Sequence, residues 1–245
     1  MHKLITVTWS NEEQSNYVDS FLYKTFIKNN NKENFINLHF NRIPPLEQEN
    51  EYKNMFGVQS EYIFYKIVKL YEYLHYLDNG IYIYADINDV VCLDNINNID
   101  ISNIGDSVLF GCESHQHPTL ATINNWPVNT YLDNYFLNSG LYIGTRDNII
   151  KLLGDCIQNI LPLHFKNFGG DQGVFVFDYL NNQNTLITLD KNNKWFLSTY
   201  LKSHNNYNKI NNKLYSFDTD TTPTFVHDNG WNYGSPRFIE HFNLL

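Results

Sequence analysis

The stretch IYIYADINDVV, residues 81–91, combines a short apolar run with two acidic residues. Its first four residues are all apolar or aromatic, which is typical of a central strand in a parallel sheet that is buried on both faces. Asp86 and Asp89 follow that strand at a spacing of three. Ligands of open α/β sheets gather at the carboxyl ends of the strands, so we expect both carboxylates to face one ligand.

A divalent cation is the ligand that this pair of carboxylates suits best. Mg²⁺ and Mn²⁺ prefer hard oxygen ligands, and both ions bridge the oxygens of a diphosphate. The alternative is that Asp86 and Asp89 only cap a turn, as Asp commonly does. The spacing taken by itself leaves both interpretations open.

Strands and helices alternate on both sides of this stretch. The spacing of apolar residues predicts strands over 3–8, 35–40, 107–112, 141–143 and 225–227, and helices over 12–28, 58–77, 147–160 and 171–180. Ser10 or Asn11 would cap the first helix. The Asn-rich stretch 181–213 is expected to be irregular, apart from short strands near 186–189 and 213–217. The alternation predicts an α/β fold over one domain, 1–245, with a mostly parallel central sheet flanked by helices.

Three further segments place polar residues next to predicted elements. FLNSGLYIG, residues 136–144, sets a polar Asn-Ser-Gly turn before a strand, and GGDQ, residues 169–172, puts Asp171 at the start of a helix. FVHDNG, residues 225–230, ends an apolar strand at His227. Taken alone, Asp171 reads as a helix N-cap and His227 as an ordinary surface histidine. The occurrence of all three, in this order, favours a functional site.

The ordered motifs resemble those of the glycosyltransferase domain of the procollagen lysyl hydroxylases. The segments that carry the resemblance are ITVTW, YADINDVV, GCES, FLNSGLYIG, GGDQ and FVHDNG, and they extend from about residue 3 to about residue 234. The resemblance implies a GT-A (Rossmann-like) glycosyltransferase fold. It covers the transferase part of that bifunctional family alone, because the chain has no His-x-Asp motif of the kind that binds iron in a hydroxylase.

The resemblance also implies roles for individual residues. The implied ligands of Mn²⁺, or of Mg²⁺ in its place, are Asp86, Asp89 and His227. The implied nucleotide-sugar contacts are Val7, Thr8, Trp9, Asn88, Gly230 and Tyr233. The residues implied to face the donor sugar and the acceptor, as catalytic residues, are Glu113, Asn138, Asp171 and Gln172. Tyr233 stands where the family has a lysine near the diphosphate, and Arg237 is the nearest cation in the sequence.

The activity that the resemblance implies is transfer of glucose from UDP-glucose to galactosylhydroxylysine of a collagen-like polypeptide, with retention at the anomeric carbon. Alternatives within the enzyme class are a UDP-galactose hydroxylysine galactosyltransferase, another UDP-sugar transferase and a sugar-nucleotide hydrolase. An inactive module that binds glycan or nucleotide is the alternative from a different class.

Composition limits the kinds of partner and the cell compartment that we expect for this protein. The formal net charge of −9 comes with no basic stripe, which argues against a nucleic-acid partner. No apolar run approaches the roughly 20 residues of a membrane span, and MHKLITVTWS lacks the apolar core of a signal peptide. We therefore expect a cytoplasmic protein without a membrane partner.

The heavy use of Asn suggests an AT-rich genome, such as that of a protist or a giant virus. For a viral protein, a host-cell compartment or the virion is the alternative location. A homodimer stays open.

Overall fold

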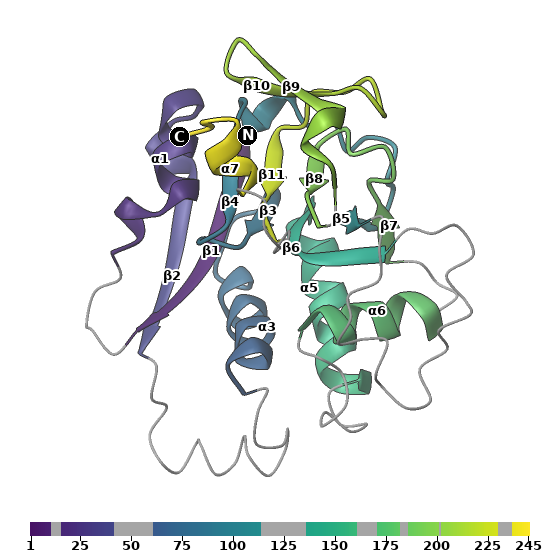
Figure 1. Ribbon diagram of the computed structural model, residues 1–245. Helices are drawn as coiled ribbons and strands as arrows, with labels where there is room; N and C mark the ends of the chain where they lie inside the picture. Colours follow the sequence, from purple (N-terminus) through teal and green to yellow (C-terminus); the bar gives the residue numbers. More distant parts are fainter. Residues whose placement is uncertain are drawn as a thin grey trace.

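The computed structural model describes residues 1–10, 16–41, 61–113, 136–160, 171–181, 186–200, 202–229 and 237–245. The described strands form a nine-stranded sheet of order β2-β1-β3-β6-β5-β8-β11-β4, in which β7 pairs with β5 at the side (Figure 1). The bounds of these strands are β1 His2–Ser10, β2 Phe35–Asn41, β3 Ile81–Ala85, β4 Val90–Cys92, β5 Val108–Glu113, β6 Phe136–Thr145, β7 Ile187–Leu189, β8 Phe196–Ser198 and β11 Phe225–His227.

The pairing is mostly parallel, as the sequence predicted. β6 runs antiparallel to both β3 and β5, and β4 runs antiparallel to β11, whereas the other pairs are parallel. A separate antiparallel hairpin, β9 (Tyr207–Ile210) and β10 (Lys213–Ser216), lies above the sheet in Figure 1. The fold is therefore the expected mixed α/β class.

Helices cover both faces of the sheet. Their bounds are α1 Phe21–Asn29, α3 Glu61–Leu74, α5 Arg146–Asp155, α6 Asp171–Asn181 and α7 Phe238–His241, with a π-helical turn at Cys156–Ile160 and 3-10 turns η1 Tyr17–Asp19, η2 Lys32–Asn34, η3 Ile96–Asn98 and η8 His204–Asn206. α3, the longest described helix, has 14 residues, and none of the described helices has the length and apolar character needed to cross a bilayer.

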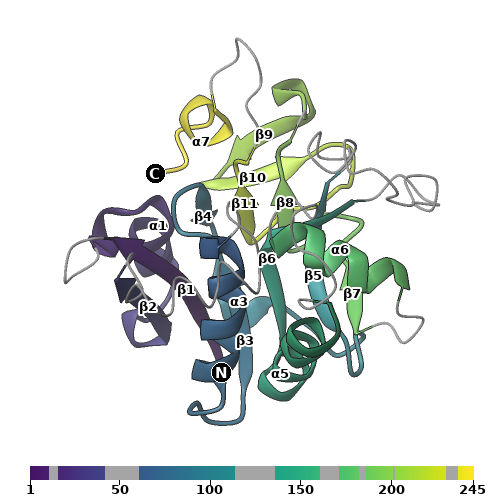
Figure 2. The ribbon, with the colours of Figure 1, turned by 90° about the horizontal axis from the view of Figure 1, so that it is seen from below.

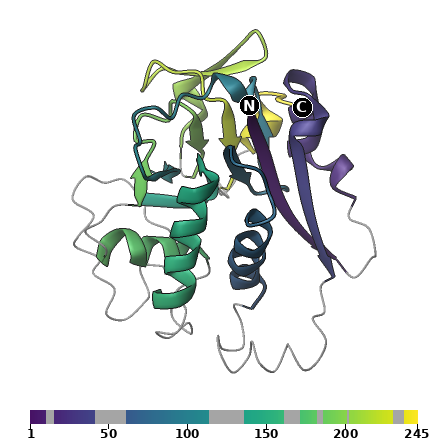
Figure 3. The ribbon, with the colours of Figure 1, turned by 180° about the vertical axis from the view of Figure 1, so that it is seen from behind.

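The side chains of β3 point alternately to the two faces of the sheet, and those on both faces are apolar or aromatic, so both faces need helices to cover them. Tyr82 and Tyr84 lie in the apolar cluster that includes α3, α5 and α6, whereas Ile83 and Ala85 lie in the cluster that includes α1. Figure 2 shows α3 and α5 lying over the central strands, and Figure 3 shows α1 beside β1 and β2, away from α5 and α6. β3 is thus buried on both sides, and its carboxyl end is held firmly in place.

The polar Asn-Ser-Gly segment lies inside β6, so the prediction of a turn before the strand was wrong. Phe110 pairs with Tyr142, whereas the next residue, Gly111, pairs with Asn138. The intervening residues of β6 therefore form a bulge, which redirects their side chains. The bulge keeps the strand continuous while it presents polar groups near the end of β3.

Two other predictions also need correction. Of the helix predicted over 12–28, residues 12–15 lie outside the described residues, and α1 begins at Phe21, because Ser20 has extended backbone angles and its hydroxyl accepts a hydrogen bond from the Tyr23 amide (3.2 Å). The stretch 181–213, expected to be largely irregular, contains β8 and β9. β8 has only three residues, which is too short to show a period of two.

Candidate active site

The loop between β3 and β4 carries the two predicted carboxylates, and hydrogen bonds fix it at both ends. The amide of Asp86 donates to the carbonyl of Gly140 on β6 (2.9 Å), and the amide of Asp228 donates to the carbonyl of Asp89 (2.7 Å). Since Asp228 directly follows β11, the loop is attached to the ends of two different strands. Three segments that are distant in the sequence therefore meet at one place.

Asp86, Asp89 and His227 converge at this place. Each offers one ligand atom, and these atoms all lie within 4.8 Å of one another. The Nε2 atom of His227 lies 3.4 Å from Oδ1 of Asp89. Two carboxylates and one imidazole form a donor set that suits a divalent cation such as Mn²⁺.

The orientation of the His227 ring is set by Asn138. Nδ1 of His227 lies 2.9 Å from Oδ1 of Asn138, which also accepts a hydrogen bond from the Gly140 amide (3.0 Å). Because that Asn138 atom is an acceptor, Nδ1 must be the donor, and Nε2 is left to face Asp89. Ligating histidines are commonly oriented in this way, through a hydrogen bond from the ring nitrogen that does not bind the metal.

Glu113 supports Asn138 from behind. Its Oε1 atom accepts hydrogen bonds from the side-chain amides of Asn138 (2.7 Å) and Asn229 (2.6 Å). Burial raises the pKa of the Glu113 carboxyl, and its Oε2 atom has no hydrogen-bond partner among the described residues. Glu113 and Asn138 thus form a buried layer beneath His227.

Charge at the site alters the protonation of His227. Burial alone would lower the pKa of its imidazole, but the nearby carboxylates of Asp89, Asp86 and Glu113 outweigh burial and raise it. Burial likewise opposes ionisation of Asp89, yet His227 and Arg237 lower the pKa of its carboxyl. The carboxylates around His227 therefore favour the cationic form of its imidazole.

Gly140 is required by the close approach of these side chains. A Cβ atom at this position would lie 2.2 Å from Cε1 of His227 and 2.9 Å from Oδ2 of Asp86. Real Cβ contacts essentially never come so close, and both neighbours are held by hydrogen bonds of their own. A side chain at position 140 would therefore displace His227 or Asp86.

Lys66 on α3 connects Asp86 with Asp171. Its Nζ atom lies 3.3 Å from Oδ1 of Asp86 and 2.5 Å from Oδ2 of Asp171, and the Tyr84 hydroxyl donates to the same Asp86 oxygen (2.7 Å). Burial favours the neutral amine, but the two carboxylates outweigh it and raise the pKa of Lys66. A buried cation between two carboxylates is thus part of the site.

Sequence reasoning missed Lys66, although a signal was present. Lys66 lies one helical turn before Leu70 within the predicted helix 58–77, so it interrupts an apolar stripe. A charged residue on the buried stripe of a helix needs a partner of opposite charge inside the protein. Arg237, the cation that the sequence offered, instead pairs with Asp228 (3.3 Å between Nε and Oδ2).

A pocket of about 660 Å³ opens over these groups. This volume is in the usual range for a small-molecule site. Its described lining consists of Val7, Thr8, Asn16, Tyr17, Asp19, Ser20, Lys66, Asp86, Ile87, Asn88, Asp89 and Asp171. The pocket thus combines carboxylates, one lysine and residues from the end of β1.

Several residues expected at the nucleotide sugar line this pocket, and others do not. Val7, Thr8, Asn88 and Asp171 belong to the lining, whereas Glu113, Asn138 and Gln172 are not among its described residues. Gln172 follows Asp171 on α6, and its buried Nε2 atom has no hydrogen-bond partner among the described residues. The side chain of Trp9 and all of Gly230 and Tyr233 lie outside the described residues.

Comparison with solved structures identifies the fold. The chain is similar to an active-site mutant of LgtC, with a TM-score of 0.52 and 11% identity over 99% of this chain and 94% of that chain. It also matches a glycosyltransferase involved in glycosylation of the major capsid of PBCV-1, with a TM-score of 0.44 and 12% identity over 99% of this chain and 100% of that one. The likeness to LgtC shows a GT-A fold.

Comparison of sequences identifies the family. No curated protein matches the chain. A family model described as the PLOD GT domain matches residues 48–235, a segment that contains Asp86, Asp89, His227, Lys66 and Asp171. The chain therefore belongs to the PLOD GT domain family and is a glycosyltransferase.

Proposed function

We propose that this chain transfers glucose from UDP-glucose to galactosylhydroxylysine in a collagen-like polypeptide, with retention at the anomeric carbon. The observation that carries the proposal is the convergence of Asp86, Asp89 and His227 beside a pocket that also holds Asp171. The family resemblance supports the choice of donor and acceptor. We further propose that residues 1–245 act as one domain.

Asp86, Asp89 and His227 would hold Mn²⁺, or Mg²⁺ in its place. The fit rests on the donor set, on the Nε2 atom of His227, which faces Asp89, and on the space that Gly140 leaves. The bound cation would act as a Lewis acid that neutralises charge on the departing diphosphate. Val7, Thr8 and Asn88 would bind the nucleotide, together with Trp9, Gly230 and Tyr233.

Asp171 would act on the donor sugar. Its carboxylate lines the pocket at the first turn of α6 and forms an ion pair with Lys66, so it is suited to stabilise positive charge that develops at the anomeric carbon. In the front-side retaining mechanism that we propose, the acceptor hydroxyl attacks from the leaving-group side, and an oxygen of the departing diphosphate takes its proton. No separate general base is then needed from the protein. Gln172 would contact the sugar or the acceptor beside Asp171.

Glu113 and Asn138 would support the reaction through His227. The structure places both side chains in the buried layer behind the ring, where they hold Nδ1 as the donor. The ring is thereby oriented before the cation arrives, which lowers the cost of binding it.

A donor and acceptor screen tests the proposal. UDP release should depend on Mn²⁺ and should be fastest with UDP-glucose and a galactosylhydroxylysine peptide, and NMR of the product should show the anomeric configuration of the donor. Preference for UDP-galactose and plain hydroxylysine would instead identify a galactosyltransferase. Release without an acceptor would indicate a hydrolase, and no release with any donor would indicate an inactive binding module.

Substitution Gly140→Ala should weaken Mn²⁺ binding by about ten-fold or more, because the new methyl group displaces His227 or Asp86. Titration calorimetry with Mn²⁺ measures the change, and a thermal melt confirms that the variant folds. The matched control is Gly80→Ala, whose Cβ would meet only the Tyr82 ring at an ordinary 3.5 Å. Equal Mn²⁺ affinity in the Gly140→Ala and Gly80→Ala variants would show that the space at Gly140 is not needed for Mn²⁺ binding.

Substitution Asp171→Asn should lower the rate of transfer by about a hundred-fold to a thousand-fold, because the amide keeps the shape and loses the charge. Mn²⁺ affinity should fall little, since Asp171 is not one of the three ligands. Asp147→Asn is the control, because Asp147 occupies the first turn of α5 and reports any general effect of helix charge. A near-normal turnover in Asp171→Asn would reject its assigned role.

Substitution Lys66→Met should have opposite effects on two measurements. Mn²⁺ should bind several-fold more tightly, because the ammonium group no longer repels the cation or contacts Asp86. Transfer should slow by about ten-fold or more, because buried Asp171 loses its counter-ion. Lys69→Met on the same helix, whose Nζ atom pairs with Glu72, is the control. Weaker Mn²⁺ binding in Lys66→Met would show that the Lys66 ammonium group does not repel the bound cation.

A further inference from the structure

Tyr17 is the single aromatic side chain among the described residues that line the pocket. It lies on η1, between β1 and α1, and its ring stacks on Phe35 of β2 (centroids 5.8 Å apart, planes 11° apart). Tyr23 meets both rings edge-on, at 5.2 Å from Tyr17 and 5.1 Å from Phe35. The Tyr17 ring is therefore supported on one face and along one side, and the residue is partly exposed and lines the pocket.

The backbone under Tyr17 is also fixed. The amide of Ser20 (3.0 Å) and its hydroxyl (2.6 Å) both donate to the Tyr17 carbonyl, and the same hydroxyl caps α1. The amide of Asp19 donates to the Asn16 carbonyl (3.0 Å). An aromatic surface that is ordered before a ligand arrives loses little entropy on binding, which favours affinity.

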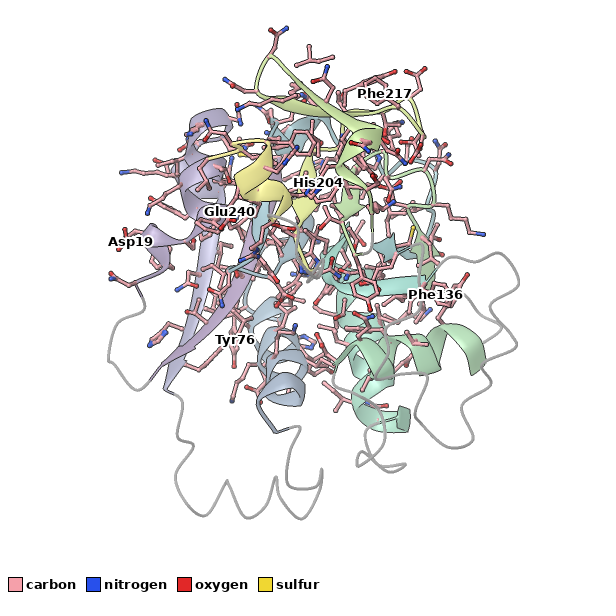
Figure 4. The ribbon with its side chains drawn as sticks, viewed as in Figure 1. Asp19, Tyr76, Phe136, His204, Phe217 and Glu240 are labelled. Atoms are coloured by element: carbon pink, nitrogen blue, oxygen red, sulfur yellow. The ribbon has the colours of Figure 1, made fainter. Side chains whose placement is uncertain are left out.

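The order of groups along the sheet indicates what this surface meets. Strand order runs from β1 through β3 to β6 and β5, so η1 lies on one side of the β3 loop and α6, which packs on β6, lies on the other. Figure 1 shows α1 and α6 at opposite sides, and Figure 4 shows Asp19 of η1 on the α1 side. Asp86 and Asp89, which follow β3, line the same pocket as Tyr17 and Asp171, and the strand order puts the β3 loop between η1 and α6.

From this order we propose that Tyr17 is the stacking surface for the nucleobase of the donor; this inference rests on the proposed function. A nucleoside diphosphate sugar has its diphosphate in the middle, its base at one end and its sugar at the other. With the diphosphate at Asp86 and Asp89 and the sugar at Asp171, the base comes to the Tyr17 end. Every nucleobase has a planar face that stacks on an aromatic ring, and the exposed Asn16 and Asp19 side chains are close enough in the lining to contact the ribose or the base edge.

The test compares two probes, UDP and inorganic pyrophosphate, each titrated with Mn²⁺ into the full chain. Tyr17→Leu should bind UDP about ten- to a hundred-fold more weakly, because stacking on one aromatic ring is lost, and should bind pyrophosphate as the unchanged chain does. Tyr17→Phe should keep UDP affinity within about two-fold, because the ring and its contact with Phe35 remain. Tyr76→Leu, at an 86% exposed tyrosine outside the pocket lining, controls for loss of a tyrosine.

Each outcome decides the inference. Selective loss of UDP affinity in Tyr17→Leu, with retention in Tyr17→Phe, supports it. Unchanged UDP affinity in Tyr17→Leu would overturn it and leave the proposed function intact, as would an equal loss of UDP and pyrophosphate affinity. Failure of the unchanged chain to bind UDP with Mn²⁺ would overturn the proposed function and this inference together.

Discussion

The space left by the missing side chain at Gly140 is the constraint on which the site depends. His227 and Asp86 come from strands β11 and β3, and each passes so near Gly140 that a single methyl group would collide with both. The carbonyl of Gly140 also accepts the Asp86 amide, so the same residue fixes the loop and leaves room for its side chain. The bulge in β6 is what brings Gly140 to this position.

Charge balance is the second constraint, and it links Asp86, Asp89 and His227 to Asp171 in the pocket. Four acidic residues, Asp19, Asp86, Asp89 and Asp171, line one pocket, and the last three have basic partners close by. Lys66 is shared between Asp86 and Asp171, whereas His227 faces Asp89. Lys66 is buried, and the two carboxylates raise the pKa of its amine, so a cation lies directly beside Asp171. The acidic character of the pocket is therefore tuned by α3, an element outside the ligand motifs.

The sequence predicted best those site residues that lie at the carboxyl end of a strand or directly after it. The apolar run of β3 placed Asp86 and Asp89, and the short run of β11 placed His227, because strands of an α/β sheet deliver their following residues to one edge. The β6 bulge could not be predicted, since it depends on the register with β5. Lys66 was hidden within a helix pattern, and Tyr17 lay in a stretch expected to be helical throughout. Both reach the pocket through tertiary packing, which local periodicity does not encode.

We propose that Asp86, Asp89 and His227 together bind one divalent cation. Anomalous diffraction near the manganese absorption edge, from crystals grown with Mn²⁺ and UDP, would locate that cation. We expect one strong peak within bonding distance of an oxygen of each carboxylate and of the Nε2 atom of His227. A peak located elsewhere, or a well-ordered pocket in which UDP is bound without a peak at these residues, would contradict it.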